Sequence, residues 1–115
     1  MPPAIPELSL LEFHVLLALA AEPLYGYAIK EAIVRESGGA LTPRPGSLYR
    51  VLGRLGVSGW VRDTVLSGSA PAHPGLERKY YALTRAGRRV LGDEARRLKH
   101  SATLAERRLL MPRER

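Results

Sequence analysis

The sequence predicts a mainly α-helical fold with a small β-hairpin: a winged helix-turn-helix that is followed by a long C-terminal helix. Three observations lead to this fold class. Apolar residues recur at helical spacing in three segments before residue 60. Two short segments rich in β-branched and aromatic residues then flank a stretch of Gly, Ser and Pro. A last segment, from residue 85 to about residue 110, keeps one apolar line at helical spacing.

The first two helices are predicted from their ends. Residues 8–21 form the first, because Ser9 is a suitable N-cap and Glu12, three residues later, completes a capping-box pattern. The second is expected to begin at Leu24 and to run to about Ser37. The glycines at positions 38 and 39 then end it, as glycine past a helix terminus commonly does.

The third helix, Pro45–Leu55 and a few residues beyond, has two unlike faces. One face is apolar and consists of Leu48, Val51, Leu52 and Leu55. The other face bears hydroxyl groups and positive charge and consists of Ser47, Tyr49, Arg50 and Arg54. Exposed helices normally carry both signs of charge, whereas this face has no acidic residue. Such a face suits an anionic surface such as the DNA major groove.

The segment after the third helix changes character. Residues 60–66 and 77–83 have the composition of strands, and Ser67–Leu76 between them reads as a hairpin tip. Trp60, at the start of the first strand, is expected to belong to the core. Two strands with a tip, placed directly after a helix-turn-helix, make a wing.

Thr84 is the expected N-cap of the last helix, which would be nearly 40 Å long at roughly 1.5 Å per residue. Its apolar residues are spaced four and three apart, as in a heptad seam. They are Leu91, Ala95, Leu98, Ala102, Ala105 and Leu109. A domain this small cannot cover such a helix alone, so we expect the seam to form the interface of a homodimer. The alternative is that the helix packs back on the N-terminal helices, and some contact with the first helix is expected in either case.

Charge is unevenly placed along the chain, whose net charge is +7. Residues 1–43 hold two basic and five acidic side chains, while residues 44–115 hold sixteen basic and six acidic ones. This asymmetry points to an anionic partner, most simply nucleic acid. The alternative is that the positive charge has no specific partner and serves only to keep the protein soluble.

Several function classes find no support. The chain has no cysteine, and His14, His73 and His100 are scattered without metal-ligand spacing. It shows no nucleophile elbow, no phosphate-binding glycine loop and no paired-carboxylate motif, so we expect neither an enzyme nor a cofactor. It also shows no apolar run long enough to span a membrane and no secretion signal. A cytoplasmic protein is the corresponding expectation.

Four motifs together resemble the PadR family of bacterial transcription regulators. They are Leu24-Tyr25-Gly26-Tyr27-Ala28-Ile29, Pro45-Gly46-Ser47-Leu48-Tyr49, Gly59-Trp60-Val61 and Arg78-Lys79-Tyr80-Tyr81-Ala82-Leu83-Thr84-Arg85-Ala86-Gly87. The resemblance implies a homodimeric winged-helix DNA-binding protein with a single C-terminal helix, usually a repressor. It also implies a small aromatic or amphipathic effector. One departure concerns Arg44, which stands where the family often has a small polar residue that can cap the helix.

These observations define two expected parts: a winged-helix DNA-binding domain over residues 1–83 and a C-terminal dimerisation helix over residues 84–115. The candidate contacts to double-stranded operator DNA come from the third helix and its approach, the start of the second helix and the returning strand. They are Arg44, Ser47, Tyr49, Arg50, Arg54, Tyr25, Arg78 and Lys79. For Tyr49 the alternative role is packing under the wing, and for the cations it is simple solvation. Two other functions stay open: a winged-helix module for protein partners, and a small-molecule sensor with weak DNA binding.

Overall fold

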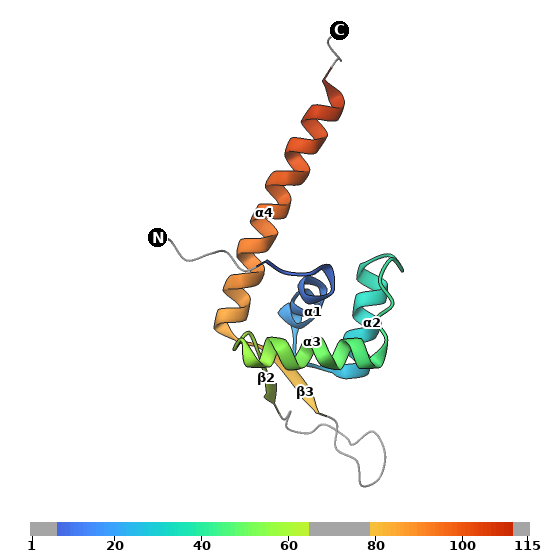
Figure 1. Cartoon of the computed structure of the whole chain (residues 1–115), viewed down its shortest axis with the longest axis vertical. Coiled ribbons are helices and arrows are strands. Elements are labelled where there is room, and N and C mark those ends of the chain that lie inside the picture. The colour runs from blue at the N-terminus through green and yellow to red at the C-terminus, as the bar shows by residue number, and fades with distance from the viewer. Residues whose placement is uncertain (1–6, 65–78, 112–115) are drawn as a thin grey trace.

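The computed structural model describes residues 7–64 and 79–111, and over these ranges the chain is mainly helical with one small antiparallel sheet (Figure 1). The fold class predicted from the sequence is confirmed. The helices and strands, in chain order, are α1 Leu10–Ala21, β1 Leu24–Tyr25, α2 Gly26–Glu36, α3 Pro45–Val57, β2 Val61–Thr64, β3 Tyr80–Leu83 and α4 Arg85–Leu110.

The predicted capping box at the start of α1 is present. The Ser9 hydroxyl accepts a hydrogen bond from the Glu12 backbone N–H at 3.1 Å. In return, Glu12 Oε1 accepts one from the Ser9 backbone N–H at 2.8 Å. The helix therefore begins at Leu10, two residues later than the apolar spacing suggested, and Leu8 is buried just outside it.

The prediction that a helix begins at Leu24 was wrong. Leu24 and Tyr25 form β1, which pairs antiparallel with β3 so that Leu24 lies opposite Tyr81 and Tyr25 opposite Tyr80. The rings of Tyr25 and Tyr80 meet edge to face, 5.6 Å apart. Helical spacing continues through these two residues, but cross-strand pairing with a distant strand stabilises the extended form. As a result, the described part of the sheet has three strands, in the order β1-β3-β2.

The core lies between α1, the buried sides of α2 and α3, and the sheet. The apolar face predicted for α3 is confirmed, since all four of its residues are buried against this core. Trp60 is partly buried and packs at the core's edge, as expected. The predicted strand segments extend further than β2 and β3: Trp60 and Lys79 lie just outside the strands, and residues 65–66 and 77–78 fall outside the described ranges.

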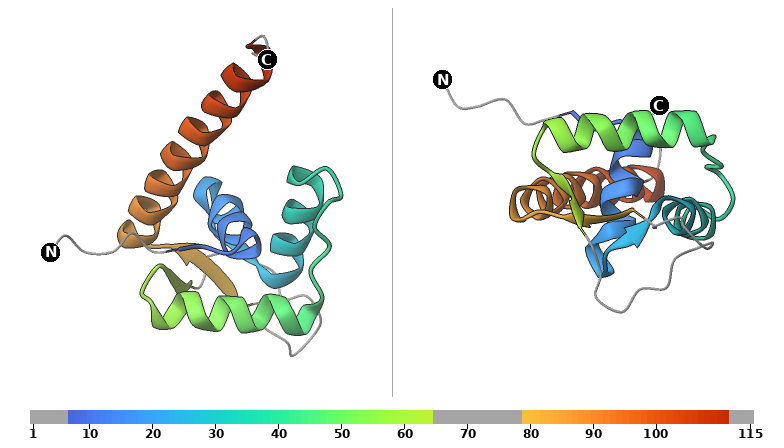
Figure 2. Two further views of the ribbon diagram at one scale, coloured as in Figure 1. Left: turned by 45° about the horizontal axis from the view of Figure 1, so that its top comes forward. Right: turned by 90° about the horizontal axis from the view of Figure 1, so that it is seen from below.

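Helix α4 begins against the wing and then leaves the domain. Its N-cap Thr84 accepts the Gly87 N–H at 3.0 Å, as predicted, and the Thr84 hydroxyl donates to the Gly59 carbonyl at 2.6 Å. Only Gly87, Leu91 and Glu94 of this helix are buried, and the C-terminal half projects away from the rest of the fold (Figure 2). Within the described residues no helix is both long and apolar enough to cross a bilayer.

Candidate nucleic-acid interface

Helix α3 presents its polar side to solvent. Ser47, Tyr49, Arg50 and Arg54 are all exposed, while Leu48, Val51, Leu52 and Leu55 on the opposite side are at most 5% exposed. Figure 1 shows α3 as the lowest helix, with β2 and β3 beside its C-terminal end. The four predicted residues of this helix are therefore brought together on one accessible face.

The N-terminus of α3 has no side-chain cap. Arg44 occupies the N-cap position without a capping hydrogen bond, and Pro45 follows at the first helical position. Proline fits there because its missing N–H costs no intrahelical bond. Backbone N–H groups of a first turn lack intrahelical partners and, with the helix dipole, favour a phosphate. Arg44 and Ser47 are exposed at this end, so both can share that role.

Tyr49 packs on the start of α2 and also lies close enough to Tyr81 of β3 to interact with it electrostatically. Its ring lies directly over Gly26, where a Cβ atom would come within 2.9 Å of the Tyr49 Cζ atom. Even so, Tyr49 is 52% exposed. The contact therefore holds the hydroxyl end of Tyr49 against α2, while about half of the residue stays accessible.

The two arginines of the α3 face have different surroundings. Arg54 approaches α1, where its Nη2 atom lies 3.7 Å from Oε2 of Glu12. Arg50 makes no ion pair with any residue in 7–64 or 79–111. Sequence reasoning missed Glu12 as a partner of Arg54 because the two are 42 positions apart and only packing brings them together.

Of the two cations predicted on the returning strand, only Lys79 lies within the described residues; Arg78 lies outside them. Lys79 spans the base of the wing to Asp63, with Nζ 3.1 Å from Oδ2. The hydrogen bond to Asp63 raises the pKa of the Lys79 ammonium above its usual value. Its positive charge is therefore partly offset by a neighbouring carboxylate.

Tyr25 is placed differently from the α3 residues. It is half-buried in β1, with its ring against Tyr80, so it belongs to the sheet edge as well as to the approach to α2. Its neighbour Tyr27 is 59% exposed, and the Lys30 ammonium lies 6.0 Å from the centre of the Tyr27 ring.

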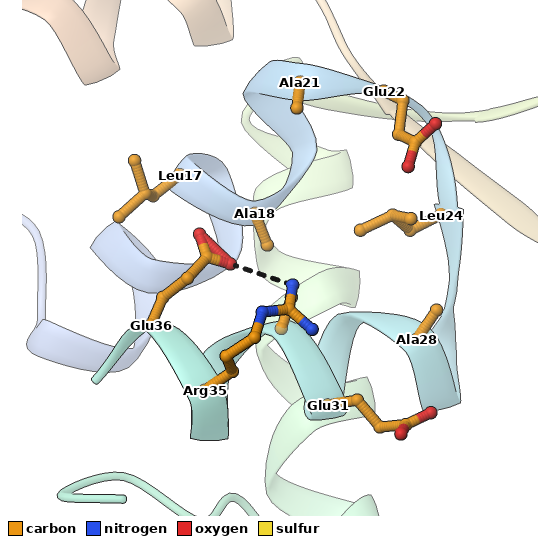
Figure 3. A pocket seen from close by; sticks show the side chains of 10 residues that line it. Leu17, Ala18, Ala21, Glu22, Leu24, Ala28, Glu31, Arg35 and Glu36 are labelled. Carbon is orange, nitrogen blue, oxygen red and sulfur yellow. Dashed lines mark ion pairs between the residues drawn. The ribbon is translucent and has the colours of Figure 1, made fainter. Parts of the chain in front are cut away.

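Acidic residues gather elsewhere, in a groove of about 420 Å³ between α1 and α2 (Figure 3). Glu22, Glu31 and Glu36 line it, with Leu17 and Leu24 among its apolar residues. An ion pair of 3.8 Å joins Arg35 to Glu36. No residue of α3, β2, β3 or α4 lines this groove. Three glutamates of the N-terminal part thus line a groove that α3 does not border, whereas Glu12 lies beside Arg54.

The structure divides the predicted seam of α4 into two parts. Leu91 is 8% exposed and belongs to the core of its own chain. The other five residues are exposed, with Leu98 at 41% and Leu109 at 84%. Between the two parts lies buried Glu94, which accepts two hydrogen bonds from the Arg97 guanidinium, at 2.8 and 2.7 Å.

Comparison with known proteins gives the family. Residues 15–93 match the model of the transcriptional regulator PadR-like family. The chain belongs to this family. The match ends inside α4, so the exposed part of the seam lies beyond it.

Solved structures agree with this assignment. A PadR family transcription regulator from Clostridium difficile is similar over 88% of this chain and 99% of its own, with a TM-score of 0.72 and 23% identity. Bacillus subtilis PadR, solved in complex with operator DNA, is similar over 76% of this chain and 47% of its own, with a TM-score of 0.62 and 26% identity. The first likeness concerns the fold, while the second structure shows a family member on operator DNA.

A sequence relative comes from a transposon. A 37.1 kDa protein of transposon Tn4556 from Streptomyces fradiae is 43% identical over 81 residues. The aligned region is 70% of this PadR-like chain and about a fifth (21%) of the relative. The chain belongs to the PadR-like family and spans about a fifth of the length of this transposon relative.

Proposed function

We propose that this PadR-family regulator is a homodimeric repressor that binds an operator through α3 and is released by a small aromatic or amphipathic effector. The observation that supports DNA binding most directly is the face of α3. It exposes Ser47, Tyr49, Arg50 and Arg54 and has no acidic residue of its own, and the opposite side of the helix is buried in the core.

In this proposal α3 enters the major groove with its N-terminal turn toward a phosphate. Arg50, free of ion pairs within the described residues, is the main candidate for reading a guanine edge or holding a phosphate. Arg44 and Ser47 bind the backbone at the start of α3, and Lys79 and Tyr25 lie at the base of the wing and the approach to α2. Phosphate contacts of this kind make affinity fall with salt.

The dimer is supported by apolar surface that one chain leaves open. The C-terminal part of the α4 seam is exposed, and Leu10 on α1 is 60% exposed. Helix α1 is apolar almost all round, which is typical of a helix that is covered on more than one side. A second copy would supply that cover, and a two-fold dimer would present two α3 helices to two half-sites.

Effector control would act through the orientation of α4 in the dimer. The Thr84 N–H donates to the Trp60 carbonyl at 3.0 Å, and Gly87 lies in direct contact with the same carbonyl. The start of α4 is thereby fixed to the turn that follows α3. A ligand that changes how α4 meets its partner would therefore move α3 as well. Such a ligand must bind the DNA-incompetent dimer more tightly than the competent one.

Selection of bound sequences from random duplex DNA tests the proposal, followed by affinity measurements on the selected site. Wild type should bind it specifically and with strong salt dependence. Arg50→Ala should fold normally and lose roughly 1–3 kcal/mol of binding free energy if it reads a base. Arg35→Ala, which removes the same charge from α2, is the matched control and should change binding little.

Two outcomes would contradict the proposal. Failure to enrich any sequence, in a protein that is folded, would favour the interaction-module alternative. Equal losses in Arg50→Ala and Arg35→Ala would mean that only net charge matters and that α3 has no special role. For the effector, a screen of aromatic and amphipathic compounds by Trp60 fluorescence should give ligands that release the operator. Ligands that bind without releasing it would contradict effector control.

A further inference from the structure

We infer that Glu12 is a specificity-determining residue: its carboxylate restrains Arg54 and limits the sequence-independent part of DNA binding. The inference rests on the proposed DNA-binding function of α3. It starts from the observation that the two oxygens of one carboxylate have separate partners. Oε1 accepts a hydrogen bond from the Ser9 N–H in the capping box. Oε2 lies 3.7 Å from the Nη2 atom of Arg54 on α3.

The capping box makes Glu12 a fixed charge rather than a mobile one. Its side chain is 16% exposed, and both its backbone N–H and its Oε1 are engaged with Ser9. Arg54, by contrast, is a long side chain that is 56% exposed. Of the two partners, Arg54 is therefore the one that can move.

An arginine at this position has two alternatives on DNA. It can swing to the nearest phosphate, which any sequence offers, or it can stay beside Glu12. Neutralising a phosphate releases a counterion, and this contribution is independent of sequence. A carboxylate that competes for the guanidinium reduces that contribution, so a larger share of the total affinity comes from sequence-dependent contacts. Arg50, which has no such partner among the described residues, remains free for DNA.

The chain offers a substitution that isolates this role. In Glu12→Gln the amide oxygen can still accept the Ser9 N–H, and glutamine is an accepted residue at this position of a capping box. The NH₂ group that replaces Oε2 can no longer hold Arg54. The variant should therefore keep α1 and lose the restraint.

The expected results are measured on one selected operator and one unrelated duplex over a range of salt concentrations. Glu12→Gln should bind the unrelated duplex roughly three- to tenfold more tightly, and the slope of log affinity against log salt should steepen by about 0.9. The ratio of operator to unrelated affinity should fall. In an Arg54→Ala background, Glu12→Gln should have no effect, because the restrained side chain is gone. Glu31→Gln, with the same change of net charge on α2, should leave the ratio unchanged.

Some outcomes would overturn the inference and leave the proposed function intact. One is specific, salt-dependent binding by wild type together with an unchanged ratio in Glu12→Gln. Another is an equal gain from Glu12→Gln with and without Arg54, which would indicate a general field effect. Lack of DNA binding by wild type would overturn both proposals. A comparison that does not require the Glu12 variant to fold is also available on the unrelated duplex: Arg54→Ala should reduce the salt slope less than Arg44→Ala, which removes a proposed phosphate contact, and an equal reduction would contradict the restraint.

Discussion

The Tyr49 side chain of α3 fills the space that a side chain at residue 26 would need. Its hydroxyl end lies against Gly26, the first residue of α2, so the Tyr49 side chain meets the α2 backbone directly at this point. The contact links a residue of the proposed DNA-binding face to the helix that supports it.

Gly26→Ala tests this relationship. The added methyl group would meet the free end of an exposed side chain and not backbone, so we expect Tyr49 to swing outward and the fold to survive. The free energy of unfolding should change by less than about 1.5 kcal/mol, because the helix-favouring effect of alanine offsets part of the cost. Operator affinity should fall to the level of Tyr49→Ala, as measured by titration. Wild-type affinity in Gly26→Ala would show that the position of Tyr49 does not matter for binding.

A second prediction concerns the fixed start of α4. In Gly87→Ala the new methyl group would overlap the backbone carbonyl of Trp60 and lie 2.8 Å from Leu83 Cδ1. Because backbone cannot move aside cheaply, we expect a loss of about 1–3 kcal/mol in the free energy of unfolding. Gly53→Ala is the control, since nothing lies within 4 Å of the added atom and the residue is inside a helix. It should gain up to about 1 kcal/mol. Equal effects of the two substitutions in chemical denaturation would contradict the close contact.

The dimer proposal predicts the effect of a charge on the exposed seam. Leu98 is an exposed apolar residue of α4. Leu98→Asp should convert the dimer to a monomer, as measured by sedimentation at micromolar concentration. Burial of a leucine side chain is worth roughly 1.5–3 kcal/mol, and two-fold symmetry counts the position twice. Thr103→Asp introduces the same charge on another side of the helix and should leave the dimer intact. A wild-type protein that sediments as a monomer would end this proposal.

Glu94 should make stability depend on pH in the acid range. Hydrogen bonds from Arg97 hold the pKa of Glu94 below its usual value of 4.5. A carboxyl group whose pKa is lowered by folding stabilises the protein above that usual value, and the contribution is lost as pH falls through the lowered pKa. Glu94→Gln should therefore melt at lower temperature than wild type near pH 7, and the difference should shrink toward pH 3. Glu106→Gln, on the same helix, should show no such trend. A difference that stays constant across this range would assign the effect to packing instead.

The sequence by itself determined the helical elements and the two faces of α3. Ser9 and Glu12 specified a capping box, and the four apolar residues of α3 specified its buried side, because both signals depend on neighbours within one or two turns. The same holds for Thr84 as the cap of α4. The four sequence motifs also predicted the PadR family, and the family match confirms that prediction.

Only the tertiary structure decided what distant segments do to one another. It converted Leu24 and Tyr25 from an expected helix start into β1, since pairing with β3 outweighs local helical spacing. It placed Leu91 in the core of its own chain while leaving Leu98 and Leu109 exposed, a division that the repeat of the seam could not reveal. It also brought Glu12 to Arg54 and Gly26 to Tyr49. Each of these contacts joins residues on different elements, and the periodicity of a single segment contains no information about its partners in space.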